Sequence, residues 1–150
     1  MFALNEPTTE RVPMKIRTFT NLEHESVYAV GFPGSDNINL STPIGAGNLD
    51  SYRNDITFTQ GIVNFIEEHF VTKKGELILH DADLPSGMKG SPLMDKEGFV
   101  VGVNTRTDGS DYSQAVSSNE LVHFLEEYNI PWETQTAAKQ FPSTNWITPL

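Results

Sequence analysis

The chain has 150 residues, of which 37% are hydrophobic and none is cysteine, and its formal net charge is −10. This length allows one domain with one modest core. The acidic balance opposes binding to nucleic acid, where phosphate neutralisation by basic side chains supplies most of the affinity. No apolar run of about 18 residues occurs, so no membrane span is expected, and no secretory signal pattern opens the sequence. The composition does not point to a compartment.

Metal sites and other cofactors are not expected either. The absence of cysteine excludes disulfides and thiolate ligands. The four histidines lack the spacing of metal-binding pairs, and we expect each of them to be exposed or fully hydrogen-bonded. They are His24, His69, His80 and His123.

The first half of the chain predicts short strands separated by polar loops. Residues 15–20 alternate polar and apolar side chains, and residues 27–31 form a clearer strand that the Pro33-Gly34 turn closes. Residues 34–55 are rich in Gly, Asn, Asp and Ser, which predicts a long loop. Residues 56–70 predict one strand, an interruption at Gly61 and a second strand.

The second half continues the pattern and ends in a helix. A hairpin turn at residues 73–75 leads into a strand at 76–80, and further strands are predicted at 99–105 and 112–116, with a turn at 108–110 between them. The helix that follows begins with a capping-box pattern from Ser117 to Glu120 and ends before Pro131. Its apolar stripe consists of Leu121, Phe124, Leu125 and Tyr128. Six or so short strands and one terminal helix predict an all-β fold, an antiparallel barrel with one C-terminal α-helix.

A Gly-rich loop occupies the middle of this pattern, at Gly87-Met88-Lys89-Gly90-Ser91-Pro92-Leu93. The loop resembles the nucleophile loop of trypsin-like serine proteases, whose HtrA-type and glutamyl-endopeptidase branches carry G-N-S-G-G/S-P-L/V. Lys89 stands at the position of the nucleophilic serine. Four further segments resemble the same family in order and spacing: Val27 to Gly34, Thr57 to Val63, Asp81-Ala82, and Ala115 to Ser118.

The resemblance also implies a domain organisation. It covers roughly residues 24 to 130, which fit the second of the family's two β-barrels, so we expect residues 1–130 to form a C-terminal barrel with its helix and 131–150 an extended tail. Phe2-Ala3-Leu4 is similar to the end of the segment that carries the catalytic aspartate. We therefore expect the first barrel, with its histidine and aspartate, to be a partner in cis or in trans.

The resemblance further implies which residues form the site. The oxyanion donors would be the backbone N–H groups of Gly87 and Lys89, and the specificity pocket would be bounded by Asp83 and by the strand residues Val103, Asn104 and Thr105. An alternative for Asp81 and Asp83 is that they pair with Arg106 or Lys89. Glutamyl endopeptidases carry a histidine where this chain has Asn104, so a strict preference for acidic residues is not implied.

Three functions stay open. The favoured one is a serine endopeptidase domain that is expected to be catalytically silent. Lys89 replaces the nucleophilic serine with an amine that is protonated near neutral pH, and the first barrel with its histidine and aspartate is expected to be absent from this chain. The chain could instead be a pseudoprotease that binds a peptide or protein along the retained cleft. It could also be a structural unit that needs the first barrel to cover an exposed apolar face.

Overall fold

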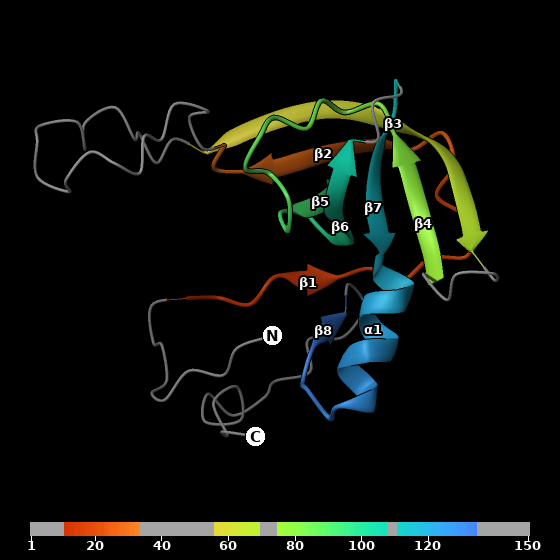
Figure 1. Cartoon of the computed structure of the whole chain (residues 1–150). Helices are drawn as coiled ribbons and strands as arrows, with labels where there is room; N and C mark the ends of the chain where they lie inside the picture. The colour runs from red at the N-terminus through yellow and green to blue at the C-terminus, as the bar shows by residue number, and fades with distance from the viewer. Residues whose placement is uncertain (1–10, 34–55, 70–74, 108–110, 135–150) are drawn as a thin grey trace, which may run out of the picture.

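The computed structural model describes residues 11–33, 56–69, 75–107 and 111–134 (Figure 1). The strands are β1 (Lys15–Ile16), β2 (Ser26–Gly31), β3 (Thr57–His69), β4 (Gly75–His80), β5 (Pro92–Asp95), β6 (Val100–Thr107), β7 (Ser113–Ser117) and β8 (Glu133–Thr134). The helix is α1 (Ser118–Glu127). The predicted loop at 34–55, the turns at 73–75 and 108–110, and most of the predicted tail involve residues outside these ranges.

Six of the strands form a closed antiparallel barrel, as the sequence predicted. Their order is β5-β2-β3-β4-β7-β6, and the additional pairing of β5 with β6 closes the ring. Alternate residues of a strand face opposite sides, so one side chain in two enters the barrel. The fully buried core is Leu22, Val27, Ala29, Val63, Ile78, Ala82, Met88, Leu93, Val101 and Ala115.

The interruption predicted at Gly61 is wrong, because β3 is continuous from Thr57 to His69. The irregularity of this strand lies further on, as a register shift against β4 between Val63 and Phe65. Gly61 has a different purpose: a Cβ atom there would lie 2.1 Å from the backbone nitrogen of Ala82. The glycine therefore marks a close approach of two backbones, which is the other common reason for glycine within a strand.

The apolar stripe predicted for the helix is partly wrong. Leu125 is buried and Leu121 is half-buried, but Phe124 and Tyr128 are 40% and 49% exposed, and the two rings contact each other on the surface. Val122 takes their place in the interior. The row that faces the barrel is thus shifted around the helix, because β1 and β6 cover only one side of it. The buried members of this small second core are Ile16, Val100, Val122 and Leu125.

The predicted helix start is confirmed, although only half of the capping box forms. The Ser117 hydroxyl accepts a hydrogen bond from the Glu120 N–H at 3.3 Å. The Glu120 carboxylate instead accepts the N–H of Glu76 at 3.1 Å. The cap therefore also ties the helix to β4, the strand on which Glu76 lies.

Two short strands lie beside the helix, outside the barrel (Figure 1). β1 is shorter than the predicted 15–20 strand and pairs in parallel with β6 and with β8. The first described residues of the predicted tail therefore join the sheet through β8. The helix of the described part has 10 residues, and no helix there is long and apolar enough to cross a membrane.

Candidate active site

Two consecutive β-turns form the loop from Pro85 to Ser91. The N–H of Met88 donates to the carbonyl of Pro85 at 3.1 Å, and the N–H of Ser91 donates to the carbonyl of Met88 at 3.0 Å. Gly87 and Gly90 take the third position of each turn, with φ of 88° and 83°. The residues before them have no positive φ, so both turns match type II, which favours glycine at that position. The sharp backbone path predicted for the two glycines is confirmed.

Contacts below the loop hold it against the barrel. Met88 is fully buried, and its sulfur packs against Gly31. A Cβ atom added to Gly31 would lie 2.6 Å from this sulfur. The N–H of Gly90 donates to the carbonyl of Asn104 at 2.7 Å, and the N–H of Asn104 donates to the carbonyl of Ser91 at 2.9 Å. The loop is therefore continuous with β6, and its geometry does not depend on the side chain of residue 89.

Lys89 lies at the exposed tip of this loop. The structure gives it no ion pair or hydrogen bond with another described residue, and the same is true of the Gly87 N–H. The backbone N–H groups of Gly87 and Lys89, which the resemblance implies as oxyanion donors, are thus both available to a ligand. A carbonyl oxygen or a carboxylate is the kind of group that such paired donors bind.

The predicted specificity residues flank the loop. Asp83 is exposed, and its backbone carbonyl accepts the hydroxyl of Thr59. On β6, Val103 and Thr105 are half-buried, and the hydroxyl of Thr105 donates to the carbonyl of Gln114. The substrate-binding role of these residues stays a prediction.

Asn104 is the predicted residue that the structure ties most closely to the loop. It is 1% exposed, and its Nδ2 donates to the Ser91 hydroxyl at 3.0 Å. Its Oδ1 lies 3.1 Å from Nε2 of His80. A buried polar chain thus runs from the barrel interior through Asn104 to the loop.

The expectation of exposed or fully hydrogen-bonded histidines is wrong for His80. This imidazole is fully buried, and its Nε2 donates to Asn104 Oδ1. The other ring nitrogen, Nδ1, has no hydrogen-bond partner. Burial lowers the pKa of His80 below its ordinary value of 6.5, although the bond to Asn104 and the nearby Asp81 carboxylate oppose this shift. His80 belongs to a strand pattern, so no local sequence signal distinguished it from an apolar interior residue.

The alternative that Asp81 pairs with Arg106 or Lys89 is not found among the described residues. Its Oδ1 accepts the N–H of Ile62 at 2.6 Å. The ion pairs between two described residues are those of Arg17 with Glu25 and with Asp95.

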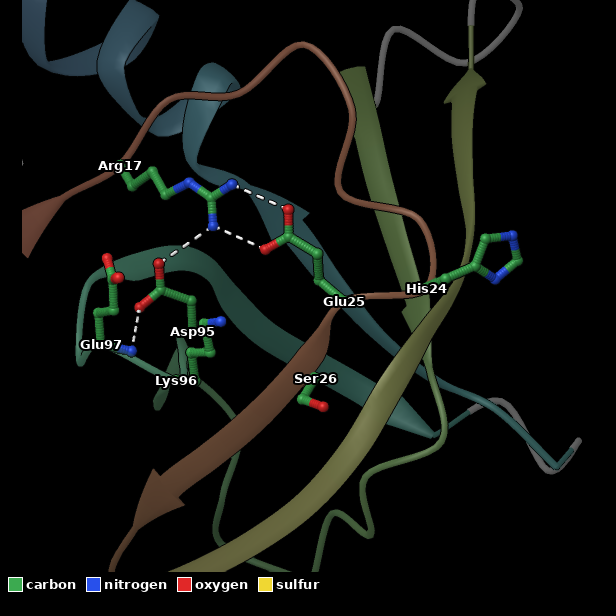
Figure 2. Close-up of a pocket in the computed structure, with 7 residues that line it drawn as sticks. All are labelled: Arg17, His24, Glu25, Ser26, Asp95, Lys96 and Glu97. Atoms are coloured by element: carbon green, nitrogen blue, oxygen red, sulfur yellow. Dashed lines mark hydrogen bonds and ion pairs between the residues drawn. The ribbon is translucent and has the colours of Figure 1, made fainter.

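A polar pocket of about 510 Å³ lies at the other end of β5 from the loop (Figure 2). It contains Arg17, which donates to both carboxylate oxygens of Glu25 at 2.8 and 2.9 Å and to Oδ2 of Asp95 at 3.1 Å. Oδ1 of Asp95 accepts the N–H groups of Glu97 and Phe99, both at 2.9 Å. The hydrogen bonds from Arg17 lower the pKa of Glu25. Because these charges already satisfy one another, we interpret the pocket as a structural ion-pair cluster.

The described residues contain no group of three or more His, Cys, Asp or Glu side chains that could hold a metal ion. The candidate site consists of the loop, its two backbone donors, Lys89 and the adjoining end of β6.

Comparison with known proteins identifies a related protease in sequence. The chain is 38% identical over 78 residues to Protease Do-like 5, chloroplastic, of Arabidopsis thaliana; this match covers 47% of the chain and 24% of that protein. The chain therefore spans only about a quarter of the length of this curated relative.

Solved structures support the fold. The crystal structure of the Rv3671c protease in its inactive form, and that of an inactive mutant of Rv3671c from M. tuberculosis H37Rv, each match with a TM-score of 0.58 at 16% identity. The matches cover 81% and 82% of this chain and 56% of each solved chain. Finally, the family model of the trypsin-like peptidase domain matches residues 2–103, more than half of the sequence. The chain belongs to the family of trypsin-like peptidase domains.

Proposed function

We propose that this chain is a trypsin-like serine endopeptidase domain that is catalytically silent. The observation that carries the proposal is Lys89, which occupies the tip of the two-turn loop where the family resemblance places the nucleophilic serine. The parent family hydrolyses peptide bonds. Acyl transfer of that kind needs a nucleophile, a base that activates it and donors for the oxyanion.

Only the donors have candidates in this part of the fold. Lys89 ends in an ammonium on a flexible four-carbon stem, not in a hydroxyl next to the backbone donors. The hydroxyl of Ser91 is bonded to the buried Asn104 amide, below the loop. His80 is the histidine joined to this loop by hydrogen bonds, and it is committed to Asn104 in the barrel interior.

The second candidate is a pseudoprotease that binds an extended peptide or protein segment. It is favoured by the end of β6, which runs beyond β5. The last residue pair of these two strands is Pro92 with Val103, whereas Arg106 and Thr107 pair only with β7 among the described residues. An unpaired strand edge beside a rigid loop suits ligand binding by strand addition.

A first barrel in cis or in trans is a further proposed partner. Large apolar side chains are exposed where the end of β2 meets the start of β3: Phe32 is 58% exposed, Ile56 52% and Phe58 62%. They are neighbours because Gly31 pairs with Thr57. Such a contiguous apolar patch favours a protein partner over solvent.

Labelling with a fluorophosphonate probe, which reacts with an activated serine, tests the proposal. The native chain should not be labelled. A Lys89→Ser variant joined to the first barrel of an HtrA-type protease should be labelled, and the matched Lys89→Ala variant should not. Labelling of the native chain would disprove catalytic silence, and absence of label from the Lys89→Ser fusion would favour the binding module.

A further inference from the structure

We propose that the loop binds the C-terminal carboxylate of a peptide, with Lys89 as the cation that selects it. This inference rests on the proposed function, because it assigns a ligand class to a site that no longer cleaves. One carboxylate oxygen would accept the N–H groups of Gly87 and Lys89, and the charge would be neutralised by the Lys89 ammonium. No bond is made or broken.

The donors are fixed before any ligand arrives. Between Gly87 and Ser91 every other backbone N–H has an internal acceptor: Met88 bonds to Pro85, Gly90 to Asn104 and Ser91 to Met88. The buried Met88 side chain and the bonds to β6 hold this pattern in place. Binding therefore requires little ordering of the loop, which lowers its entropic cost.

The charge of Lys89 is uncompensated within the described part of the chain, although the whole chain has a net charge of −10. Arg106, exposed and two residues beyond Asn104 on β6, adds a second positive side chain at the same end of the barrel. An anionic ligand could pair with these two cations, whereas the exposed carboxylate of Asp83, which also flanks the loop, would oppose it. A charge-assisted hydrogen bond is also about twice as strong as a neutral one.

The space around the loop favours a chain end. A Cβ built on Gly90 meets no atom within 4 Å, so the surface next to Lys89 is open. The long stem of Lys89 starts from the position where a serine would have ended after one carbon. We expect this longer side chain to hinder a peptide that continues past the two N–H groups, whereas a terminal carboxylate has nothing beyond it.

The test is an NMR titration of the full ¹⁵N-labelled chain with N-acetyl-trialanine, as the free acid and as the C-terminal amide. The free acid should shift the amide signals of Gly87 and Lys89, and the Gly90 signal should move less because its N–H already bonds to Asn104 at 2.7 Å. We expect the acid to bind about tenfold more tightly than the amide, the effect of one charge-assisted contact.

Two lysine variants are matched for this measurement. Lys89→Met should reduce the affinity for the acid to that for the amide. Lys96→Met should leave the preference unchanged, because Lys96 is exposed in the turn at the far end of β5. The amide spectrum of each variant shows directly whether it is folded.

Three outcomes would overturn the inference: equal affinity for acid and amide, a preference that survives Lys89→Met, or no shift at Gly87 and Lys89 with either probe. The comparison of acid with amide on the native chain stands even without the variants. Fluorophosphonate labelling separates the two proposals. A silent chain without acid selectivity refutes only the carboxylate site, whereas a labelled native chain refutes the proposed function itself.

Discussion

Replacing Arg17 by methionine should lower the free energy of unfolding by about 3 kcal/mol. The side chain of its partner Asp95 is 3% exposed, and Arg17 is the partner of Oδ2 at 3.1 Å (Figure 2). Breaking a buried ion pair costs roughly 3–5 kcal/mol because a charge stays buried without its partner. Here the backbone N–H groups of Glu97 and Phe99 still bond to Oδ1, which favours the lower end of that range.

Glu25→Gln is the matched control for this prediction. The Glu25 side chain is 40% exposed, so its pairing with Arg17 should contribute at most about 1 kcal/mol. Urea unfolding followed by far-UV circular dichroism gives both free energies of unfolding. A loss below about 1 kcal/mol in Arg17→Met, or equal losses in the two variants, would contradict the reasoning that the buried Asp95 dominates. A double-mutant cycle of Arg17→Met with Asp95→Asn then measures the coupling itself.

Two further stability predictions concern the barrel. Gly61→Ala should lower the free energy of unfolding by about 1–3 kcal/mol, because the added Cβ meets the backbone of Ala82, whereas Gln60→Ala on the exposed side should change it little; equal thermal midpoints would contradict this. The pKa of His80 is lowered in the folded chain, so the unfolded chain binds more protons as the pH falls below the ordinary value of 6.5. The contribution of the neutral His80 to stability should therefore be fully present above pH 6.5 and be lost as the pH falls. His80→Gln should flatten this dependence in pH-stepped urea unfolding, and exposed His123→Gln should retain it; an unchanged slope in His80→Gln would refute the assignment.

The features predicted correctly from the sequence are those that local chemistry decides. The glycines of the loop were predicted to turn because positive φ costs glycine least, and Gly87 and Gly90 both have it. The helix start followed from one hydroxyl at Ser117. Alternating apolar residues in short runs between turn signals indicated strands, and six of these strands form the barrel.

The features that were missed depend on residues far apart in the chain. Arg17 and Asp95 are 78 positions apart, and His80 and Asn104 are 24 apart, so no window of neighbouring residues contains either pair. Phe124 and Tyr128 were wrongly placed on the buried face of the helix for the same reason. Periodicity shows that a stripe exists, but the packing of β1 and β6 decides which row of side chains it covers.

The backbone shape of the loop does not depend on the side chain that would carry out catalysis. Its shape is set by the buried Met88, by the turn glycines and by the bonds between Gly90, Ser91 and Asn104. None of these contacts involves the side chain of residue 89, which is exposed. A substitution at that one position can therefore leave the fold and the backbone donors in place while it changes the chemistry of the site, since function depends on the site and not on the fold that supports it. For this reason the identity of residue 89, and not membership of the family, decides whether this domain can cleave a peptide bond, and the functional experiments change Lys89.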